Sequence, residues 1–389
     1  MKIINLIFKE DLFMRSKFQM LYCVIVCVVM FISVLAGTGV SAEKKEPIQM
    51  AILLDTSSSM DGLIGQAKSQ LWKIVNELAT AKRNGKTPSL EVALYEYGKS
   101  SIPAQEGYIR MILPFTGDLD SVSEKLFALT TNGGDEYCGM VIESAIKNLQ
   151  WNGSNDILKI IFIAGNEPFT QGTVDYVTAC KNAASKGIIV NTIFCGNHKE
   201  GIDTKWKHGA DLADGKYINI DQNQTVAHID APQDKEIARL GAELNKTYIA
   251  YGIGGAEKKE RQAKQDMNAS EVGAGAIVQR SLAKASMQYD NSGWDLVDAA
   301  KNKRVEVDKL EKEQLPAEMK NMSAAERKDY VDKMMKKRDD TQKKINQLNE
   351  DRRKYVANEM KKQSKTNTLD TAIINSIRDQ AARKNYKFQ

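Results

Sequence analysis

Ile52-Leu53-Leu54-Asp55-Thr56-Ser57-Ser58-Ser59-Met60 is the stretch that decides the fold, because in it a buried strand gives way to a polar loop. Residues 48–54 form an apolar run with the length and continuity of a strand that is covered on both faces. After the loop, apolar residues recur every three or four positions, at Leu63, Ala67, Leu71, Ile74 and Leu78. The sequence therefore predicts a strand, a loop and an amphipathic helix in succession.

The same alternation of strand and helix patterns continues to about residue 221. Further strands are predicted at residues 90–97, 108–114, 157–164, 188–195 and 216–220, the second of them as an antiparallel edge. Helices are predicted at residues 119–129, 140–149 and 174–185, the last closed by Gly187 in the left-handed conformation. These units predict an α/β fold with a doubly wound, mainly parallel sheet.

Beyond residue 222 the pattern becomes helical. A helix is predicted at residues 233–245 and a short extended segment at 247–252. Ser323-Ala324-Ala325-Glu326 is a capping box that opens a long helix, with another helix at residues 368–380 and breaks at Pro316 and residues 363–367. Apolar residues of the long helix are spaced mostly by threes, fours and sevens. This spacing predicts a helical hairpin or a partly coiled-coil arm that self-associates.

The first 42 residues have the pattern of an export signal. Basic residues precede an apolar run at residues 20–36, and Val40-Ser41-Ala42 has the small-x-small pattern of a cleavage site. The alternative is an uncleaved membrane anchor, because the run approaches the length that spans a bilayer. Both predict an exported protein that is periplasmic, extracellular or membrane-anchored. The predicted organisation is a leader at 1–42, an α/β domain at 43–222 and a helical region at 223–389.

Composition limits the classes of function. With 389 residues and 42% hydrophobic content, the chain can bury one core and still form a second region. Its net charge of +5 is small for this length and argues against a nucleic-acid partner. The mature chain holds only Cys138, Cys180 and Cys195, too few for a disulfide scaffold. A Cys138–Cys195 disulfide is one hypothesis, and burial as small hydrophobic residues is the other.

The loop after the first strand carries the candidate chemistry. Ligands bind at the carboxyl ends of the strands in open α/β sheets, and this loop lies at such an end. Asp55, Ser57 and Ser59 alternate along it and can direct one carboxylate and two hydroxyl groups to one point. This all-oxygen set suits Mg²⁺ or another hard divalent cation with open coordination positions, which an acidic side chain of a partner could complete. The alternative is that Asp and Ser serve as turn and helix-capping residues.

The stretch from Ile52 to Met60 resembles the first motif of von Willebrand factor A (VWA) domains, whose metal-ion-dependent adhesion site (MIDAS) begins Asp-x-Ser-x-Ser. The resemblance covers about residues 47–221 and implies a VWA or Rossmann-like fold. It also implies a bound Mg²⁺, Mn²⁺ or Ca²⁺.

The other two MIDAS loops depart from the family pattern. The family has a Thr just after a Gly pair in the second loop, where this chain has Asp135. It has an Asp in the third loop, where this chain has Gly165, so that Asn166 or Glu167 would have to reach the site. The predicted metal ligands are Asp55, Ser57, Ser59, Asp135 and Glu167.

Motifs of enzymes are missing from the sequence. The three histidines, His198, His208 and His228, lack the spacing of a zinc site. No Gly-x-Ser-x-Gly motif surrounds the loop serines, and the glycines at 252–255 lack the Lys-Ser/Thr of a phosphate-binding loop. We therefore expect a binding module that uses a divalent cation for protein–protein interaction. The alternative is a metal-free VWA scaffold in which the helical tail provides recognition or oligomerisation.

Overall fold

The computed structural model describes residues 46–220, 229–362 and 369–388. The predicted leader at 1–42, the predicted boundary at residue 222 and the predicted break at 363–367 lie outside these ranges. In the described ranges, no helix combines the length and the hydrophobicity needed to cross a membrane.

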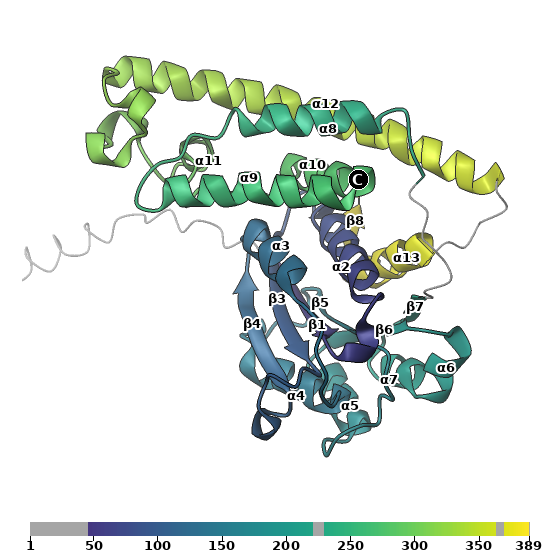
Figure 1. Cartoon of the computed structure of the whole chain (residues 1–389). Helices are drawn as coiled ribbons and strands as arrows, with labels where there is room; N and C mark the ends of the chain where they lie inside the picture. The colour runs from purple at the N-terminus through teal and green to yellow at the C-terminus, as the bar shows by residue number, and fades with distance from the viewer. Residues whose placement is uncertain (1–45, 221–228, 363–368, 389) are drawn as a thin grey trace, which may run out of the picture. The chain divides into compact units, whose positions relative to one another are not determined.

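A six-stranded sheet forms the centre of the α/β part of the chain, with strand order β4-β3-β1-β5-β6-β7 (Figure 1). The strands are β1 Pro47–Asp55, β3 Ser89–Tyr97, β4 Ile109–Thr116, β5 Lys159–Gly165, β6 Ile188–Cys195 and β7 Tyr217–Ile220. Neighbouring strands are parallel except β3 and β4, which are antiparallel. The predicted doubly wound, mainly parallel sheet with an antiparallel edge strand is confirmed.

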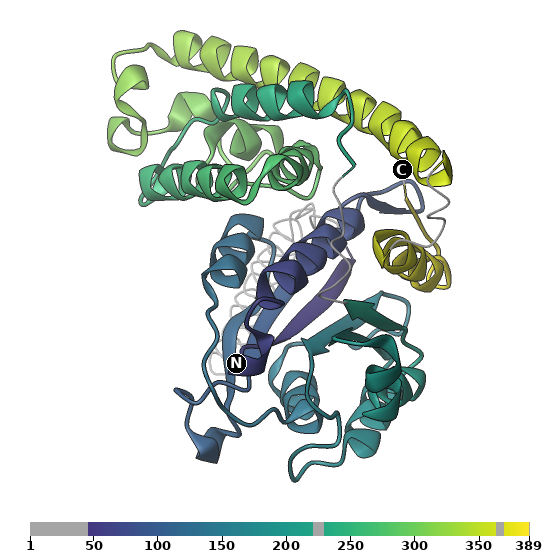
Figure 2. The ribbon, with the colours of Figure 1, turned by 45° about the vertical axis from the view of Figure 1, so that its right-hand side comes forward.

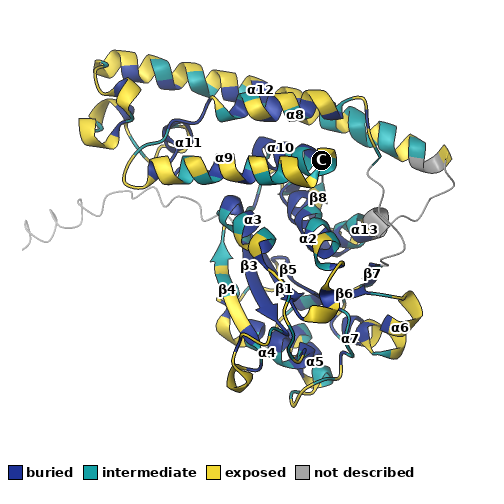
Figure 3. Ribbon diagram, in the orientation of Figure 1, coloured by how far each residue is buried: buried dark blue, intermediate teal, exposed yellow. Residues whose placement is uncertain are grey.

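β1 lies between β3 and β5 and is buried along its whole length (Figure 3). Its successive side chains point to opposite faces of the sheet. Ile52 and Leu54 belong to the core on one face, and Ala51 and Leu53 belong to the core on the other. Burial on both faces explains why β1 appears in the sequence as a continuous apolar run.

Helices cover both faces of this sheet (Figure 2). α2 and α3 contribute Leu71 and Val122 to one core, whereas α4 and α5 contribute Val141 and Ala179 to the other. The helices are α2 Ile64–Leu78, α3 Leu119–Ala128, α4 Cys138–Asn148, α5 Tyr176–Ser185, α6 His198–Asp203 and α7 Trp206–Asp211. Gly187 follows α5 with φ +66°, as predicted.

The remainder of the described chain is almost entirely helical. Its helices are α8 Asp234–Asn245, α9 Gly255–Val272, α10 Ala274–Ala285, α11 Leu296–Lys301, α12 Ala324–Lys362 and α13 Leu369–Ala382. Short 3-10 helices lie in this region at Val307–Lys309, Lys312–Gln314 and Ala317–Met319. The α/β part has two more, at Ser58–Met60 and Ala104–Glu106. α12 runs alongside α8 (Figure 1). The capping box is confirmed, since Ser323 N donates to Glu326 Oε2 at 2.7 Å and Glu326 N to Ser323 Oγ at 3.3 Å. Coiled-coil self-association stays a prediction.

A small second sheet joins the end of the chain to the α/β part. β2 Ala81–Arg83 pairs antiparallel with β8 Tyr386–Phe388, and α13 packs against α2. The sequence predicted neither strand, because three residues are too few to show a period. The described residues between 46 and 388 consequently belong to one compact unit, in which the helical part packs on the α/β part.

The predicted Cys138–Cys195 disulfide is wrong. Cys138, Cys180 and Cys195 are all free and buried. Cys195 packs into the core on the same face of the sheet as Leu54, whereas Cys138 packs into the core on the opposite face. Two thiols on opposite faces of a sheet cannot reach bonding distance, although both residues lie close to the carboxyl edge.

Candidate metal centre

The candidate centre begins where β1 ends. Asp55 is the last residue of β1, and Ser57 and Ser59 follow in the loop that leads to α2. The backbone of the loop is tied to its neighbours, since Thr56 N donates to Tyr97 O at 2.8 Å and Asn132 N donates to Thr56 O at 2.9 Å. The loops after β1, β3 and α3 therefore meet at the carboxyl edge of the sheet, as expected for this fold.

Asp55 is completely buried at this edge. Its Oδ1 accepts a hydrogen bond from Ser57 N at 2.7 Å, whereas Oδ2 is buried without a hydrogen-bond partner. Burial raises the pKa of Asp55 to about 7, and the nearby charge of Glu167 acts in the same direction. Burying a carboxylate oxygen without a hydrogen-bond donor is costly, so this atom is the first indication that the loop suits a cation.

Ser57 and Ser59 lie side by side, with their hydroxyl oxygens 2.9 Å apart. Ser59 Oγ also donates to Asn166 Oδ1 at 2.9 Å, and Asn166 Nδ2 donates to Ser59 O at 3.0 Å. This reciprocal pair holds the first loop against the third loop, which follows β5. Asp55, Ser57 and Ser59 are thus brought together as the sequence predicts.

The second loop contributes a different acid from the one predicted. The carboxylate of Asp135 accepts a hydrogen bond from the exposed Tyr137 hydroxyl at 3.1 Å. The next residue, Glu136, is buried instead, and its pKa is raised to about 7 by burial and by the charges of Asp55 and Glu167. Glu136 is therefore the acid that the second loop places beside Asp55.

Glycine at position 98 allows this approach. Gly98 has φ +78°, and a Cβ atom there would lie 2.8 Å from Oδ1 of Asp55 and 2.9 Å from Cγ of Glu136. Any side chain at position 98 would displace one of the two acids. Sequence reasoning missed Glu136 because the family pattern pointed one residue earlier, and the Gly133-Gly134 pair was the only local signal.

The third loop lacks the acid of the family pattern, and Tyr97 occupies the adjoining space. A Cβ atom on Gly165 would lie 2.6 Å from the Tyr97 hydroxyl and 3.0 Å from Oδ2 of Asp55. The Tyr97 hydroxyl donates to Ala164 O at 3.0 Å. Glu167 is close enough to raise the pKa values of Asp55 and Glu136, and its backbone carbonyl accepts a hydrogen bond from Trp206 Nε1 at 2.8 Å.

These donors fit a hard divalent cation of the Mg²⁺ type. They are carboxylate and hydroxyl oxygens from three loops, with an orphaned oxygen of Asp55 among them. In the described part of the chain, no three His, Cys, Asp or Glu side chains are grouped as a metal site. The hydroxyl groups of Ser57 and Ser59 would consequently have to be ligands, and carboxylates alone would not suffice.

Comparison with known proteins identifies the class. Residues 49–202 match the family model of the von Willebrand factor type A domain. The chain thus contains a VWA domain at these residues, and a C-terminal helical region follows it. No curated protein sequence matches it.

Similar solved structures have low sequence identity to this chain. BatB from Bacteroides thetaiotaomicron is 19% identical, with a TM-score of 0.34, over 45% of this chain and 90% of that one. An aerotolerance-related membrane protein from Bacteroides fragilis is 18% identical, with a TM-score of 0.31, over 45% and 92%. Proximal thread matrix protein 1 of the mussel byssus, solved with a zinc-occupied MIDAS motif, is 10% identical, with a TM-score of 0.35, over 46% and 43%.

Proposed function

We propose that this chain is an exported binding module and not an enzyme. Its VWA domain would hold a divalent cation at Asp55, Ser57 and Ser59 and, through it, an acidic side chain of a protein partner. The observation that carries the proposal is the buried Oδ2 of Asp55, which has no hydrogen-bond partner beside two hydroxyl groups. A cation would supply the missing interaction and offset the cost of burying the carboxylate.

The ligand types favour Mg²⁺, with Mn²⁺ and Ca²⁺ as alternatives. Ser57 and Ser59 are neutral ligands, so they leave the charge of the cation undiminished. Mg²⁺ generally keeps several waters when it binds to few protein groups, and these positions are open to exchange. A carboxylate of a partner is suited to replace such a water. Glu136 and Glu167, which lie nearby, would orient the ligands or compete with the partner's carboxylate.

Export is supported by the leader pattern alone, in which basic residues precede the apolar run at 20–36 and Val40-Ser41-Ala42 follows. N-terminal sequencing of the protein recovered from outside the cytoplasm would test cleavage after Ala42. An intact leader in the membrane fraction would favour the anchored form instead.

The cation is tested by thermal unfolding of the full chain in EDTA and in about 5 mM Mg²⁺ or Mn²⁺. A ligand that binds only the native state raises the midpoint by an amount that grows with its concentration. We expect this rise in the wild type and its loss in Asp55→Ala. Asp156→Ala is the matched control, because Asp156 is an exposed acid that precedes β5 at the opposite edge of the sheet. If the unfolding midpoint of the wild type did not rise with cation concentration, the proposed cation binding would be refuted.

A second candidate is a metal-free scaffold in which the helical region provides recognition. It is favoured by a cavity of about 480 Å³ that helices of this region form with α2. Partner binding that persists in EDTA and in Asp55→Ala would identify this alternative. Sedimentation of the full chain over a range of concentrations tests self-association through the tail.

A further inference from the structure

The second loop begins at the end of α3, where a lysine of α2 holds it. Nζ of Lys68 donates to Leu129 O at 2.5 Å and to Phe127 O at 3.3 Å. These carbonyl groups belong to the last turn of α3 and to the residue that follows the helix. Carbonyl groups at this end of a helix have no partner within it and carry partial negative charge, so they attract a cation. Lys68 therefore joins the helix that follows the first loop to the start of the second loop.

The burial of Lys68 is unusual, because no acid accompanies it. Lys68 is only 7% exposed, and it forms no ion pair with another described residue. Burial lowers the pKa of Lys68, and the nearby charge of Lys99 acts in the same direction. A buried ammonium group is costly unless hydrogen bonds compensate it, and here the carbonyl groups at the end of α3 do so. The position of the charge is therefore tied to the position of the second loop.

Lys99 holds the next residue of the second loop. Its Nζ donates to Thr130 O at 2.9 Å and to Thr130 Oγ1 at 3.1 Å. The backbone beside Lys99 also limits the path of the loop, since a Cβ atom on Gly134 would clash with Gly98 O. The segment that contains Gly98 and Lys99 therefore lies against the loop at Thr130 and again at Gly134, two residues before Glu136.

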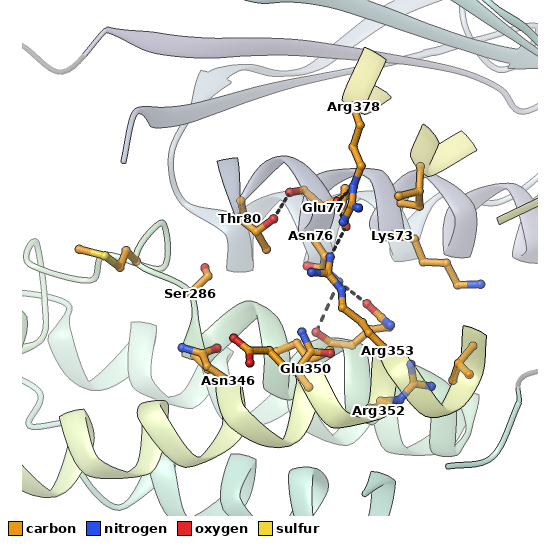
Figure 4. A pocket seen from close by; sticks show the side chains of 18 of the residues that line it. Lys73, Asn76, Glu77, Thr80, Ser286, Asn346, Glu350, Arg352, Arg353 and Arg378 are labelled. Atoms are coloured by element: carbon orange, nitrogen blue, oxygen red, sulfur yellow. Dashed lines mark hydrogen bonds and ion pairs between the residues drawn. The ribbon is translucent and has the colours of Figure 1, made fainter. Parts of the chain in front are cut away.

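The helical region in turn fixes α2, which carries Lys68. Glu77 lies near the C-terminal end of α2 and is buried. It contacts Arg353 of α12 at 2.9 Å and Arg378 of α13 at 2.7 Å (Figure 4). On the other side of Lys68, Ser59 in the loop before α2 is bonded to the third loop. Because α2 is held near both ends, Lys68 has a fixed position between them.

We propose that Lys68 and Lys99 are positioning residues of the metal centre. By holding residues 127–130, they set the path of the second loop and place Glu136 beside Asp55. This role rests on the proposed function, because it concerns the affinity of the centre for a cation. An ammonium group cannot be a ligand, since it has no free electron pair. Hydrogen bonds that orient a ligand change metal affinity by about 10- to 100-fold, whereas the positive charge of a lysine by itself would weaken cation binding.

Binding of Mn²⁺ to the full chain tests this role, with free Mn²⁺ measured by electron paramagnetic resonance at constant ionic strength. Lys68→Met removes the ammonium group and keeps an unbranched side chain, and we expect about tenfold weaker Mn²⁺ binding. Lys159→Met is the matched control. Lys159 begins β5 at the opposite edge of the sheet, is 3% exposed and donates to Asn152 O at 3.1 Å. Both substitutions should lower the unfolding midpoint in EDTA, but Lys159→Met should bind Mn²⁺ as the wild type does.

Lys99→Met keeps the test decisive if Lys68→Met does not fold, because the Lys99 side chain is less buried, at 14% exposed. It should also weaken Mn²⁺ binding. Unchanged or tighter binding by a folded variant of either lysine would overturn the positioning role. A role in stability alone lowers the midpoint in EDTA without changing the dissociation constant, and loss of a repelling charge tightens binding. If the wild type itself did not bind Mn²⁺, the proposed cation site would be refuted, and the positioning role with it.

Discussion

Asp55 and Glu136 approach the same point beside Gly98, where a Cβ atom would lie 2.8 Å from Oδ1 of Asp55 and 2.9 Å from Cγ of Glu136. Two buried acids this close to one glycine are unfavourable unless protons or a cation reduce their charge. This relationship distinguishes the second loop of this chain from the family pattern, in which a neutral Thr is expected.

Glu136→Gln and Asp135→Asn are a matched pair that tests which acid belongs to the centre. We expect Glu136→Gln to weaken cation binding by about tenfold or more, because loss of a ligand or of a group that orients one has effects of this size. Asp135→Asn should bind as the wild type does, since Asp135 contacts the exposed Tyr137 hydroxyl. The cation-dependent rise of the unfolding midpoint measures both. If Asp135→Asn weakened cation binding more than Glu136→Gln did, Asp135 would be the ligand, as the sequence predicts.

Asp55→Asn should change how stability depends on pH in EDTA. Burial raises the pKa of Asp55 from 3.8 to about 7 in the folded state, so folding takes up a proton between these values and stability falls as pH rises. Asparagine has no charge to bury. Its advantage should therefore grow from about pH 4 to about pH 7 and reach about 2 kcal/mol or more.

Urea unfolding at a series of pH values measures this difference between Asp55→Asn and the wild type. The same variant should lose the cation-dependent rise. A constant difference in the free energy of unfolding over this pH range would show that Asp55 is not a buried acid with a raised pKa.

Gly165→Asp restores the acid of the family pattern but should destabilise the protein. Its Cβ atom would lie 2.6 Å from the Tyr97 hydroxyl, and forcing extra atoms into a packed core costs about 1–3 kcal/mol. Tyr97→Phe removes the hydroxyl at the expense of one hydrogen bond to Ala164 O. In a double-mutant cycle, Gly165→Asp should cost less in the Tyr97→Phe background. If the losses of stability of the two substitutions were additive, a clash between the side chain introduced at position 165 and the Tyr97 hydroxyl would be contradicted.

Arg338→Met should separate α12 from the helices beneath it. Arg338 is 2% exposed, contacts Asp295 at 2.5 Å and Asp298 at 2.6 Å, and lies 4.0 Å from the centre of the Tyr248 ring. Removing one partner of a buried ion pair leaves the other uncompensated and costs about 3–5 kcal/mol. Lys337→Met is the control, because Lys337 is exposed and its ion pair with Glu243 is long, at 3.6 Å. Chemical unfolding measures the loss in the free energy of unfolding for both variants, which should be larger for Arg338→Met.

The three described cysteines should be unreactive in the native protein. Burial raises the pKa of Cys180 to about 12 and raises those of Cys138 and Cys195 as well, and the thiolate is the reactive form. Alkylation without reductant at about pH 8 should spare all three until guanidinium is added. Mass spectrometry of the peptides measures the labelling. A disulfide-linked peptide containing Cys138 and Cys195 would show that the pairing forms after all.

Sequence alone predicted the elements whose signals are local. The apolar run at residues 48–54, the periodic helix after it and the Ser323 to Glu326 capping box each depend on neighbouring residues, and the structure has all three. The alternation of strands and helices was enough for a parallel sheet with an antiparallel edge. The Asp55, Ser57 and Ser59 loop followed from its place after a buried strand.

Tertiary structure decided the features that depend on residues distant in sequence. Whether Asp135 or Glu136 faces Asp55 depends on how the second loop packs against Gly98. The opposite faces occupied by Cys138 and Cys195, and the meeting of Arg353 and Arg378 at Glu77, likewise arise from packing between separate elements. Hydrophobic periodicity indicates on which face of its own helix or strand a residue lies. Which residue of another element lies opposite is determined only when the elements pack together, because burial and charge pairing act across the assembled core.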